Sequence, residues 1–199
     1  MPSSSERERL ATYHAKRDLR ASGEPGGSAG RGAADEPRFV IQRHEARRLH
    51  YDFRLEIDGV LVSWAVPRGP STDPSEKRFA TRTEDHPLDY LDFEGRIPRG
   101  NYGAGTVVVW DIGTYRNLTE RRGRPVSAAD ALANGHLKVW LSGHKLTGAY
   151  ALTRARFRDD EDSWLLVKVA DEAADRRRDP VRTQPESVLT GKVNKDFED

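Results

Sequence analysis

The sequence contains no cysteine, which removes a whole class of sites from consideration. Disulfides, thiol nucleophiles and cysteine-ligated zinc are all excluded, so a metal ion would have to bind nitrogen and oxygen ligands. The net charge is also small, because 33 basic residues oppose 32 acidic ones. A basic field over the whole molecule is therefore excluded as an argument for nucleic-acid binding, and any such binding needs a local patch.

Long apolar runs are missing as well. No run approaches the roughly 20 residues that span a bilayer, and the first residues, MPSSSERERL, lack the apolar segment of a secretory signal. We therefore expect a soluble, cytoplasmic protein with no membrane partner. The 199 residues suffice for one domain with a hydrophobic core. Because 33% of them are charged, we expect part of the chain to remain unpacked.

Three segments of the chain differ in composition. Residues 6–20 have a helix-forming composition, whereas residues 22–37 are dominated by glycine, proline and alanine. Residues 1–37 are therefore predicted to be an N-terminal helix and a flexible linker. Residues 38–170 alternate short apolar runs with turn signals, which is typical of antiparallel barrels and sandwiches. Residues 171–199 are charged and interrupted by prolines, which predicts a polar tail.

The central segment predicts a mainly β fold, a compact antiparallel β-barrel with one short internal helix in addition to the N-terminal helix. Asp58 and Gly59 suit the two-residue type I′ turn of a hairpin. A helix is predicted between Ser127 and Gly135, because serine caps helix starts and glycine ends helices. The four tryptophans fall inside apolar runs and are expected in the core. The candidate strands are residues 39–42, 49–57, 60–66, 79–83, 90–95, 105–111, 136–142, 148–154 and 163–169.

The run 49–57 alternates strictly between apolar and polar residues, so a strand here would have one core face and one polar face. A polar face of this kind is usually just solvated. Residues i and i+2 of a strand are only about 6.6 Å apart, however, so His50 and Asp52 can share one cation. Arg54 can then bind an anion on that cation through its planar guanidinium. We interpret the face as a metal and phosphate site, with a solvated face as the alternative.

Two further histidines extend this interpretation. His44 precedes His50 by six residues, and the intervening EARRL would turn the chain back over the strand. Two imidazoles and one carboxylate suit manganese, iron or zinc and leave coordination positions open. His86 and Tyr90, in TEDHPLDY, are candidates for proton transfer or charge stabilisation. A polar loop between strands is the alternative for that segment.

The glycine-rich segment 97–105 lacks the lysine and the serine or threonine that end a P-loop. A tight turn is therefore favoured there over a phosphate cradle. His136 and His144 have no matching partners near them in the sequence, and we expect both to be structural.

Two long segments carry a resemblance to a known family. FVIQRHEARRLHYDFRLEIDGVLVSWAVPRGPS and HPLDYLDFEGRIPRGNYGAGTVVVWD resemble the 3′-phosphoesterase module of bacterial and archaeal DNA ligase D. The resemblance covers residues 38–169 and implies a β-barrel that processes 3′ ends of broken DNA in non-homologous end joining, with Mn²⁺ as cofactor. It implies removal of a 3′-terminal ribonucleoside and then of the 3′-phosphate, which leaves a 3′-hydroxyl.

The same resemblance implies partners and a location. DNA 3′ ends at primer-template junctions would be the substrate, and an end-joining ligase, a polymerase and Ku would be the protein partners. The location would be cytoplasmic and nucleoid-associated. We expect a free-standing form or an excised module, because the sequence has no polymerase or ligase module.

The resemblance also implies roles for individual residues. The implied metal ligands are His44, His50 and Asp52. The implied catalytic residues are His86, Arg54, Tyr90, Gln42, Arg78, Arg17, Asp18 and Glu24. The last three of these lie in the N-terminal YHAKRDLRASGEP and would serve the diesterase step. The implied phosphate-binding residues are Arg54, His86 and Arg68, the last of which stands where many relatives have lysine.

Two other functions remain open on the residues alone. His50 and Asp52 with a distant histidine are also typical of the two-histidine, one-carboxylate iron site of barrel oxygenases. A non-catalytic nucleic-acid-binding barrel is the other alternative, in which Arg43, Arg47 and Arg48 contact phosphates. The first would consume oxygen with iron, and the second would bind DNA in a salt-sensitive way without turnover.

Overall fold

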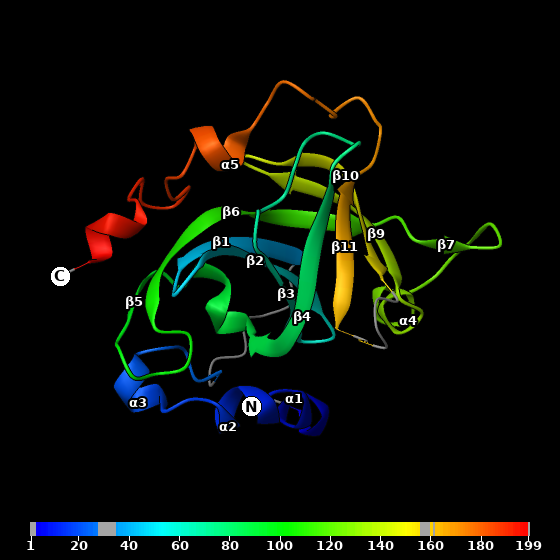
Figure 1. Ribbon diagram of the computed structural model, residues 1–199. Helices are drawn as coiled ribbons and strands as arrows, with labels where there is room; N and C mark the ends of the chain where they lie inside the picture. The colour runs from blue at the N-terminus through cyan, green and yellow to red at the C-terminus, as the bar shows by residue number, and fades with distance from the viewer. Residues whose placement is uncertain (1–2, 28–34, 156–159, 161, 199) are drawn as a thin grey trace.

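The computed structural model describes residues 3–27, 35–155, 160 and 162–198. Within them, eight antiparallel strands close a barrel in the order β1-β2-β3-β4-β11-β10-β9-β6, with β6 pairing back on β1 (Figure 1). The predicted mainly β barrel is thus confirmed. A short strand, β5, adds to β6, and β7 pairs only with β8. The strands are β1 (Arg38–Glu45), β2 (Leu49–Ile57), β3 (Val60–Val66), β4 (Lys77–Pro87), β5 (Gly95–Ile97), β6 (Gly105–Asn117), β7 (Glu120–Arg121), β8 (Arg124–Pro125), β9 (His136–Gly143), β10 (Thr147–Arg154) and β11 (Ser163–Lys168).

The helices are all short. Ser127 caps α4 by accepting from the Asp130 amide, and Gly135 follows it with a positive φ of 78°, as the sequence predicted. No helix in the described part of the chain is long and apolar enough to cross a membrane. The helical segments are α1 (Ser4–Arg9), α2 (Ala11–Ala15), α3 (Leu19–Ser22), the 3₁₀ helix η1 (Leu88–Asp92), α4 (Ala128–Ala133), α5 (Pro180–Thr183) and the 3₁₀ helix η2 (Asn194–Phe197).

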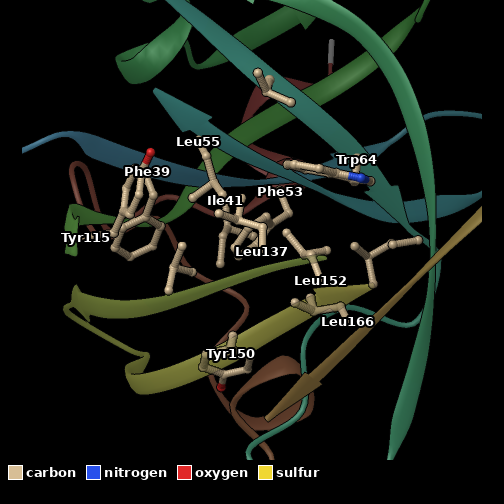
Figure 2. Packing of buried hydrophobic residues seen from close by; sticks show 14 of the residues in the cluster. Phe39, Ile41, Phe53, Leu55, Trp64, Tyr115, Leu137, Tyr150, Leu152 and Leu166 are labelled. Carbon is tan, nitrogen blue, oxygen red and sulfur yellow. The ribbon is translucent and has the colours of Figure 1, made fainter. Parts of the chain in front are cut away.

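The hydrophobic core fills the interior of the barrel. Alternate residues of each strand point inward, so that apolar side chains from β1, β2, β3 and the opposite strands β9 to β11 meet (Figure 2). The β2–β3 hairpin turns at Asp58 and Gly59, whose φ values of 50° and 81° are those of a type I′ turn. Trp64, Trp110 and Trp164 are buried as expected. Trp140 is only half-buried, because its neighbours Val139 and Leu141 take the inward positions.

One predicted strand was wrong. Most of residues 90–95 lies outside any strand, because the 3₁₀ helix η1 occupies Leu88–Asp92 and β5 begins only at Gly95. Tyr90 and Leu91 are buried on the outside of the barrel. The carbonyls of Tyr90 and Phe93 each accept a hydrogen bond of 3.0 Å from the Gln42 side chain, so a side chain takes the place of a strand partner.

The N-terminal segment also differs from its prediction, since three short helices replace the single one. The extended backbone of Asp18, whose carboxylate accepts from the Arg20 and Ala21 amides, separates α2 from α3. Leu10 and Tyr13 are buried, and α2 packs against β4 along one side of the barrel (Figure 1). Residues 22–27 of the expected linker also pack, and Glu24 is buried there. Residues 28–34 lie outside the described part.

Residues 171–198, expected as a polar tail, lie along the barrel. The Gln184 carbonyl accepts from the Trp110 indole at 2.7 Å, and the Asn194 amide donates to the Thr106 carbonyl at 2.8 Å. These contacts are made by backbone carbonyls and polar side chains, so hydrophobic patterning does not reveal them. The division of the chain at residues 37 and 170 stays a prediction.

A bulge in β6 is held by one buried carboxylate. The β1–β6 register passes from Ile41 opposite Asp111 to Gln42 opposite Val109, which leaves Trp110 as the extra residue. The Asp111 carboxylate accepts hydrogen bonds of 2.8–3.1 Å from its neighbour's amide and from the amides of residues 144, 145 and 146. It therefore ties β6 to the turn between β9 and β10.

Replacing this carboxylate should destabilise the barrel. Asp111→Ala leaves buried amides without their acceptor, and each costs about 1–3 kcal/mol. We expect the free energy of unfolding, measured by urea titration, to fall by at least about 3 kcal/mol. Glu172→Ala, at an exposed acidic residue, should change it by less than about 0.5 kcal/mol. Equal effects of the two substitutions would contradict this account of Asp111.

Candidate metal and phosphate site

The polar face of β2 points away from the barrel core, yet most of it is buried. Asp52 is 6% exposed and Arg54 is 3% exposed. A second apolar cluster covers this outer face, with Tyr13 from α2 and Tyr90 and Leu91 from η1. The strand alternation was therefore predicted correctly, but the face is covered rather than solvated. Charges held here interact more strongly than in water.

Three predicted ligands meet on this face. The β1–β2 register sets His44 directly opposite His50, and Gln42 opposite Asp52. His44 Nδ1 lies 3.3 Å from Asp52 Oδ2, and His50 Nε2 lies 3.5 Å from Asp52 Oδ1. One ligand atom from each of the three residues falls within 4.8 Å of the others. Spacings of about 3.3 Å are those of two ligands on one ion with bonds of about 2.1 Å.

The backbone orients both imidazoles toward a common point. The other nitrogen of His44, Nε2, lies 2.7 Å from the Gly103 carbonyl, and Nδ1 of His50 lies 3.1 Å from the Arg48 carbonyl. A carbonyl only accepts, so each of these nitrogens carries a proton, and in the neutral ring the opposite nitrogen presents a lone pair. Two lone pairs facing one carboxylate call for a positive charge between them. The donor set therefore fits a divalent metal ion.

The charges at the cluster also favour a cation. Burial opposes ionisation of Asp52, but the guanidinium of Arg54, together with the hydrogen bonds that the histidines donate when their facing nitrogens are protonated instead of metal-bound, outweighs it and holds its pKa well below the usual range. Burial likewise opposes protonation of His50, yet the hydrogen bond and charge of Asp52 raise its pKa. A permanently ionised carboxylate beside two imidazoles is suited to holding positive charge.

Arg54 lies next to the three ligands and is held on all sides. Its guanidinium donates to Gln42 Oε1 at 2.8 Å and to Ser63 Oγ at 2.9 Å, and it lies 3.4 Å from Asp52 Oδ2. The Tyr90 ring lies beneath it, 4.9 Å from the guanidinium carbon to the ring centre. A buried guanidinium fixed beside a metal cluster is placed to bind a phosphate oxygen.

His86, near the end of β4, lies between two guanidinium groups. Its Nδ1 is 3.1 Å from Arg54 Nη1, and its Nε2 is 3.3 Å from Arg17 Nη2. Guanidiniums only donate, so a doubly protonated ring would oppose N–H to N–H. Burial, together with the charges of Arg54 and Arg17, holds the pKa of His86 well below its ordinary value. The ring is therefore neutral at pH 7.

Arg17 brings the N-terminal segment into the site. It forms ion pairs of 3.0 Å with Glu24 and 2.8 Å with Glu84, and all three side chains are at most 5% exposed. The Tyr90 hydroxyl donates to the same Glu24 oxygen at 2.8 Å. Burial and the charge of Glu24 raise the pKa of Tyr90 well above its usual value, so the phenol stays protonated.

Three predicted residues lie apart from this cluster. Arg78 pairs with Glu76 at 2.6 Å, and it precedes His86 by eight positions on β4, about 26 Å of extended strand. Asp18 is exposed and caps α3 instead. Arg68 is exposed just beyond β3, at the barrel end where β2 begins, because Val66 pairs with Tyr51. The structure gives these three no contact with the ligands.

Other residues of the site were missed. Glu84 binds Arg17, Ser63 accepts from Arg54, and the Tyr13 ring packs edge-on against His86 with 5.0 Å between ring centres. Ser63 sits directly opposite Arg54 in the β2–β3 register, so the predicted hairpin already implied that pair. For Glu84 and Tyr13 the sequence has no local signal, because their partners lie far along the chain.

The barrel and this buried outer-face cluster define a β-barrel protein with a candidate metal and phosphate site. The family described as the DNA Ligase D 3′-phosphoesterase domain matches residues 42–154. The chain belongs to this family, which confirms the resemblance seen in the sequence.

Similar proteins agree with this assignment. The chain is 48% identical over 193 residues to the multifunctional non-homologous end joining protein LigD of Pseudomonas aeruginosa, which covers 96% of the chain and 22% of that protein. It is 41% identical over 172 residues to the LigD of Mycolicibacterium smegmatis, covering 86% of the chain and 22% of the relative. For the LigD of Mycobacterium tuberculosis the identity is 46% over 162 residues, 81% of the chain and 20% of the relative. The chain thus spans about a fifth of the length of these relatives.

Metal binding at the cluster can be measured directly. We expect one Mn²⁺ per chain by isothermal titration calorimetry, because one set of three candidate ligands converges in the described part of the chain. Asp52→Asn removes the charge that the two histidines face, and it should weaken binding at least about tenfold. Glu172→Gln makes the same kind of change at an exposed carboxylate outside the cluster and serves as the control. Undiminished binding by Asp52→Asn would place the ion elsewhere.

A second prediction concerns pH and the folding of the metal-free protein. Because the folded-state pKa of His86 is depressed, the unfolded chain takes up a proton below about pH 6.5 that the folded chain does not. The contribution of His86 to stability is therefore present above this pH and lost as the pH falls, by up to about 1.4 kcal/mol per pH unit. Urea titrations in EDTA from about pH 7.5 to about pH 5.5, the range that brackets this pKa, should show a shallower loss for His86→Gln. Parallel curves would contradict a neutral His86.

Proposed function

We propose that this chain is a manganese-dependent phosphoesterase that processes 3′ ends of DNA. It would remove a 3′-terminal ribonucleoside and then the remaining 3′-phosphate, leaving a 3′-hydroxyl. The observation that carries the proposal is the convergence of His44, His50 and Asp52 beside the buried guanidinium of Arg54. Family membership supports the same reaction class.

The metal ligands, Arg54 and His86 have different proposed roles in the cleavage. His44, His50 and Asp52 would hold a divalent cation, which would supply Lewis-acid polarisation of the phosphoryl group. Arg54 binds the phosphate and neutralises the charge that grows as the bond to the 3′ oxygen breaks. His86, held neutral between Arg54 and Arg17, hydrogen-bonds the same group. In this neutral state it is a donor or acceptor rather than a cationic acid.

The remaining contributors act through these groups. Gln42 donates to the Tyr90 and Phe93 carbonyls, which fixes its oxygen toward Arg54. Glu24 forms an ion pair with Arg17 and accepts a hydrogen bond from the Tyr90 hydroxyl, and it thereby positions Arg17 beside His86. Arg68, at the same end of the barrel as His50, is proposed to reach the phosphate of a longer substrate. Roles for Arg78 and Asp18 have no support in the contacts.

The setting of the reaction is part of the proposal. The relatives are described as non-homologous end joining proteins, so we propose that the chain acts on DNA 3′ ends at primer-template junctions during such repair. Ligase, polymerase and Ku are the proposed partners, with a cytoplasmic, nucleoid-associated location.

The iron-oxygenase alternative shares the ligand set, because two histidines and one carboxylate suit non-haem iron as well. The surroundings distinguish the two. The buried guanidinium of Arg54 lies beside the cluster, and it would be open to an anion once a metal ion takes up the charge of Asp52, which favours an anionic phosphate as substrate. Activity with manganese in the absence of oxygen would separate the two functions.

The reaction can be tested on a labelled primer-template that ends in one ribonucleotide. With Mn²⁺ we expect two successive products on a gel, a 3′-phosphate and then a 3′-hydroxyl. His50→Ala removes a metal ligand and should slow the first step at least about a hundredfold, since second-shell changes alone cost up to that much. Arg54→Lys keeps the charge but loses the planar pair of donors, and it should slow cleavage by a smaller factor.

The matched control is His144→Ala, which removes an exposed histidine outside the cluster, in the turn between β9 and β10. It should leave both steps unchanged. If His50→Ala does not alter the rate of 3′-phosphate release, the proposed mechanism is wrong. Accumulation of the 3′-phosphate with wild-type protein would restrict the activity to the diesterase step.

A further inference from the structure

A large open groove begins at the metal cluster. Its volume is about 1440 Å³, and His50 forms part of its wall. Most of the rest comes from the turn between β1 and β2 at residues 46–48 and from residues 96–106, which run from β5 to the start of β6, with Glu45 and Glu198 at the edges. The groove therefore connects solvent with the ligand that is least buried, since the His50 side chain is 23% exposed against 9% for His44 and Asp52.

The groove carries local positive charge although the chain as a whole is nearly neutral. Arg47, Arg48, Arg96 and Arg99 line it, against Glu45 and Glu198. Glu45 is paired with Arg43 at 2.5 Å, so its charge is already partly balanced. Arg47, Arg48 and Arg99 are exposed and form no ion pair with any described residue. They are available for the phosphates of a polyanion.

An exposed aromatic ring stands at the edge of the groove. Tyr102 is 47% exposed and also borders a second cavity of about 590 Å³ beside α2 and β4. The guanidinium of Arg17 and the ammonium of Lys16 each lie 5.0 Å from its ring centre. These cations hold the ring in place, and nearly half its surface remains open to a ligand. Such rings stack on nucleic-acid bases without regard to sequence.

The loop that carries Tyr102 is fixed to the metal site. Gly103, the residue after Tyr102, accepts a hydrogen bond from His44 through its backbone carbonyl. Gly105 has a φ of 145°, and a Cβ there would lie 2.1 Å from the Glu45 carbonyl oxygen, so only glycine allows this close approach. The arginines, Tyr102 and His50 thus line one groove.

We propose that this groove binds the nucleic-acid strand on the 5′ side of the scissile phosphate, with Arg47, Arg48 and Arg99 on its phosphates and Tyr102 stacked on a base. The inference rests on the proposed function and names the residues that would bring the strand to the site. Bases carry aromatic faces and phosphates carry regular negative charge, so this combination of a ring and unpaired arginines fits the last nucleotides of a primer whose end has separated from its template.

Binding can be measured without turnover. A 5′-fluorescein single-stranded 12-mer with a 3′-phosphate is titrated in EDTA at several salt concentrations, and the dissociation constant is read from anisotropy. Replacing Arg47, Arg48 and Arg99 together by Gln should reduce the slope of log affinity against log salt by about 2, because each phosphate contact on a single strand contributes about 0.7. The matched control is Arg121→Gln, Arg122→Gln and Arg124→Gln, the same charge change on the exposed β7–β8 hairpin.

Tyr102 is tested in the same assay. Tyr102→Ala should weaken binding about tenfold, and Tyr102→Phe, which keeps the ring, should restore it to within about twofold. Phe79→Ala removes another exposed ring, at the opposite end of β4 from His86, and should have no effect. Circular dichroism of each variant verifies the fold.

The two proposals fail in different ways. Two results would overturn the proposal that the groove binds the strand, even if manganese-dependent cleavage is intact. One is an equal loss of salt dependence in the groove and hairpin variants, and the other is unchanged binding by Tyr102→Ala. Absence of cleavage by the wild-type protein would overturn the proposed function but leave the anisotropy results standing. Absence of any strand binding by the wild-type protein would overturn the strand-binding proposal.

Discussion

The charged guanidinium of Arg54 is almost completely buried. Its neighbours are Asp52, Gln42, Ser63 and His86. A buried charge of this kind is tolerated only when its partners are complete, since removing one partner of a buried pair costs about 3–5 kcal/mol. The partners come from four different strands. The closure of the barrel and the position of the site are therefore one requirement, because a slip of β2 by one residue would turn Arg54 into the core.

Covering the outer face is the second part of that requirement. The N-terminal helices and η1 exclude water from β1, β2 and β3, and Arg17 arrives with them. Two arginines are then balanced by Asp52, Glu24 and Glu84. This balance lets a polar cluster stay buried while His86, between the two guanidiniums, remains uncharged. The segment before the barrel is thus part of the site rather than an appendage.

Much of the barrel could be predicted from the sequence, because strands with one buried face alternate strictly. The bounds of β2 and β3 and the turn at Asp58 and Gly59 followed from alternation and turn chemistry. The 3₁₀ helix η1 could not be recognised, since its short apolar run fits a strand equally well and a side chain, Gln42, satisfies its carbonyls. The docked C-terminal segment was missed because its contacts are made by backbone carbonyls, polar side chains and two isolated valines, Val181 and Val188, that form no apolar periodicity.

The residues of the site also fall into those that the sequence predicted and those that it did not. His50, Asp52 and Arg54 share a strand face, so local spacing was enough to group them. His44 opposite His50 followed once a turn was assumed between them. His86 meets Arg54 across 32 residues of sequence and Arg17 across 69. The segment around His86 already made it a candidate, whereas Arg17 was indicated by family resemblance alone. Glu84, which pairs with Arg17 across 67 residues, was indicated by neither.

The hydrogen bond from His44 to the Gly103 carbonyl has a consequence for cooperativity. Tyr102 lies on the wall of the groove, and the next residue, Gly103, accepts a hydrogen bond from His44, one of the proposed metal ligands. If contact with a ligand moves the ring, the adjoining peptide that orients His44 moves with it. Occupancy of the groove and affinity for the ion are then thermodynamically linked, and by reciprocity each changes the other by the same factor.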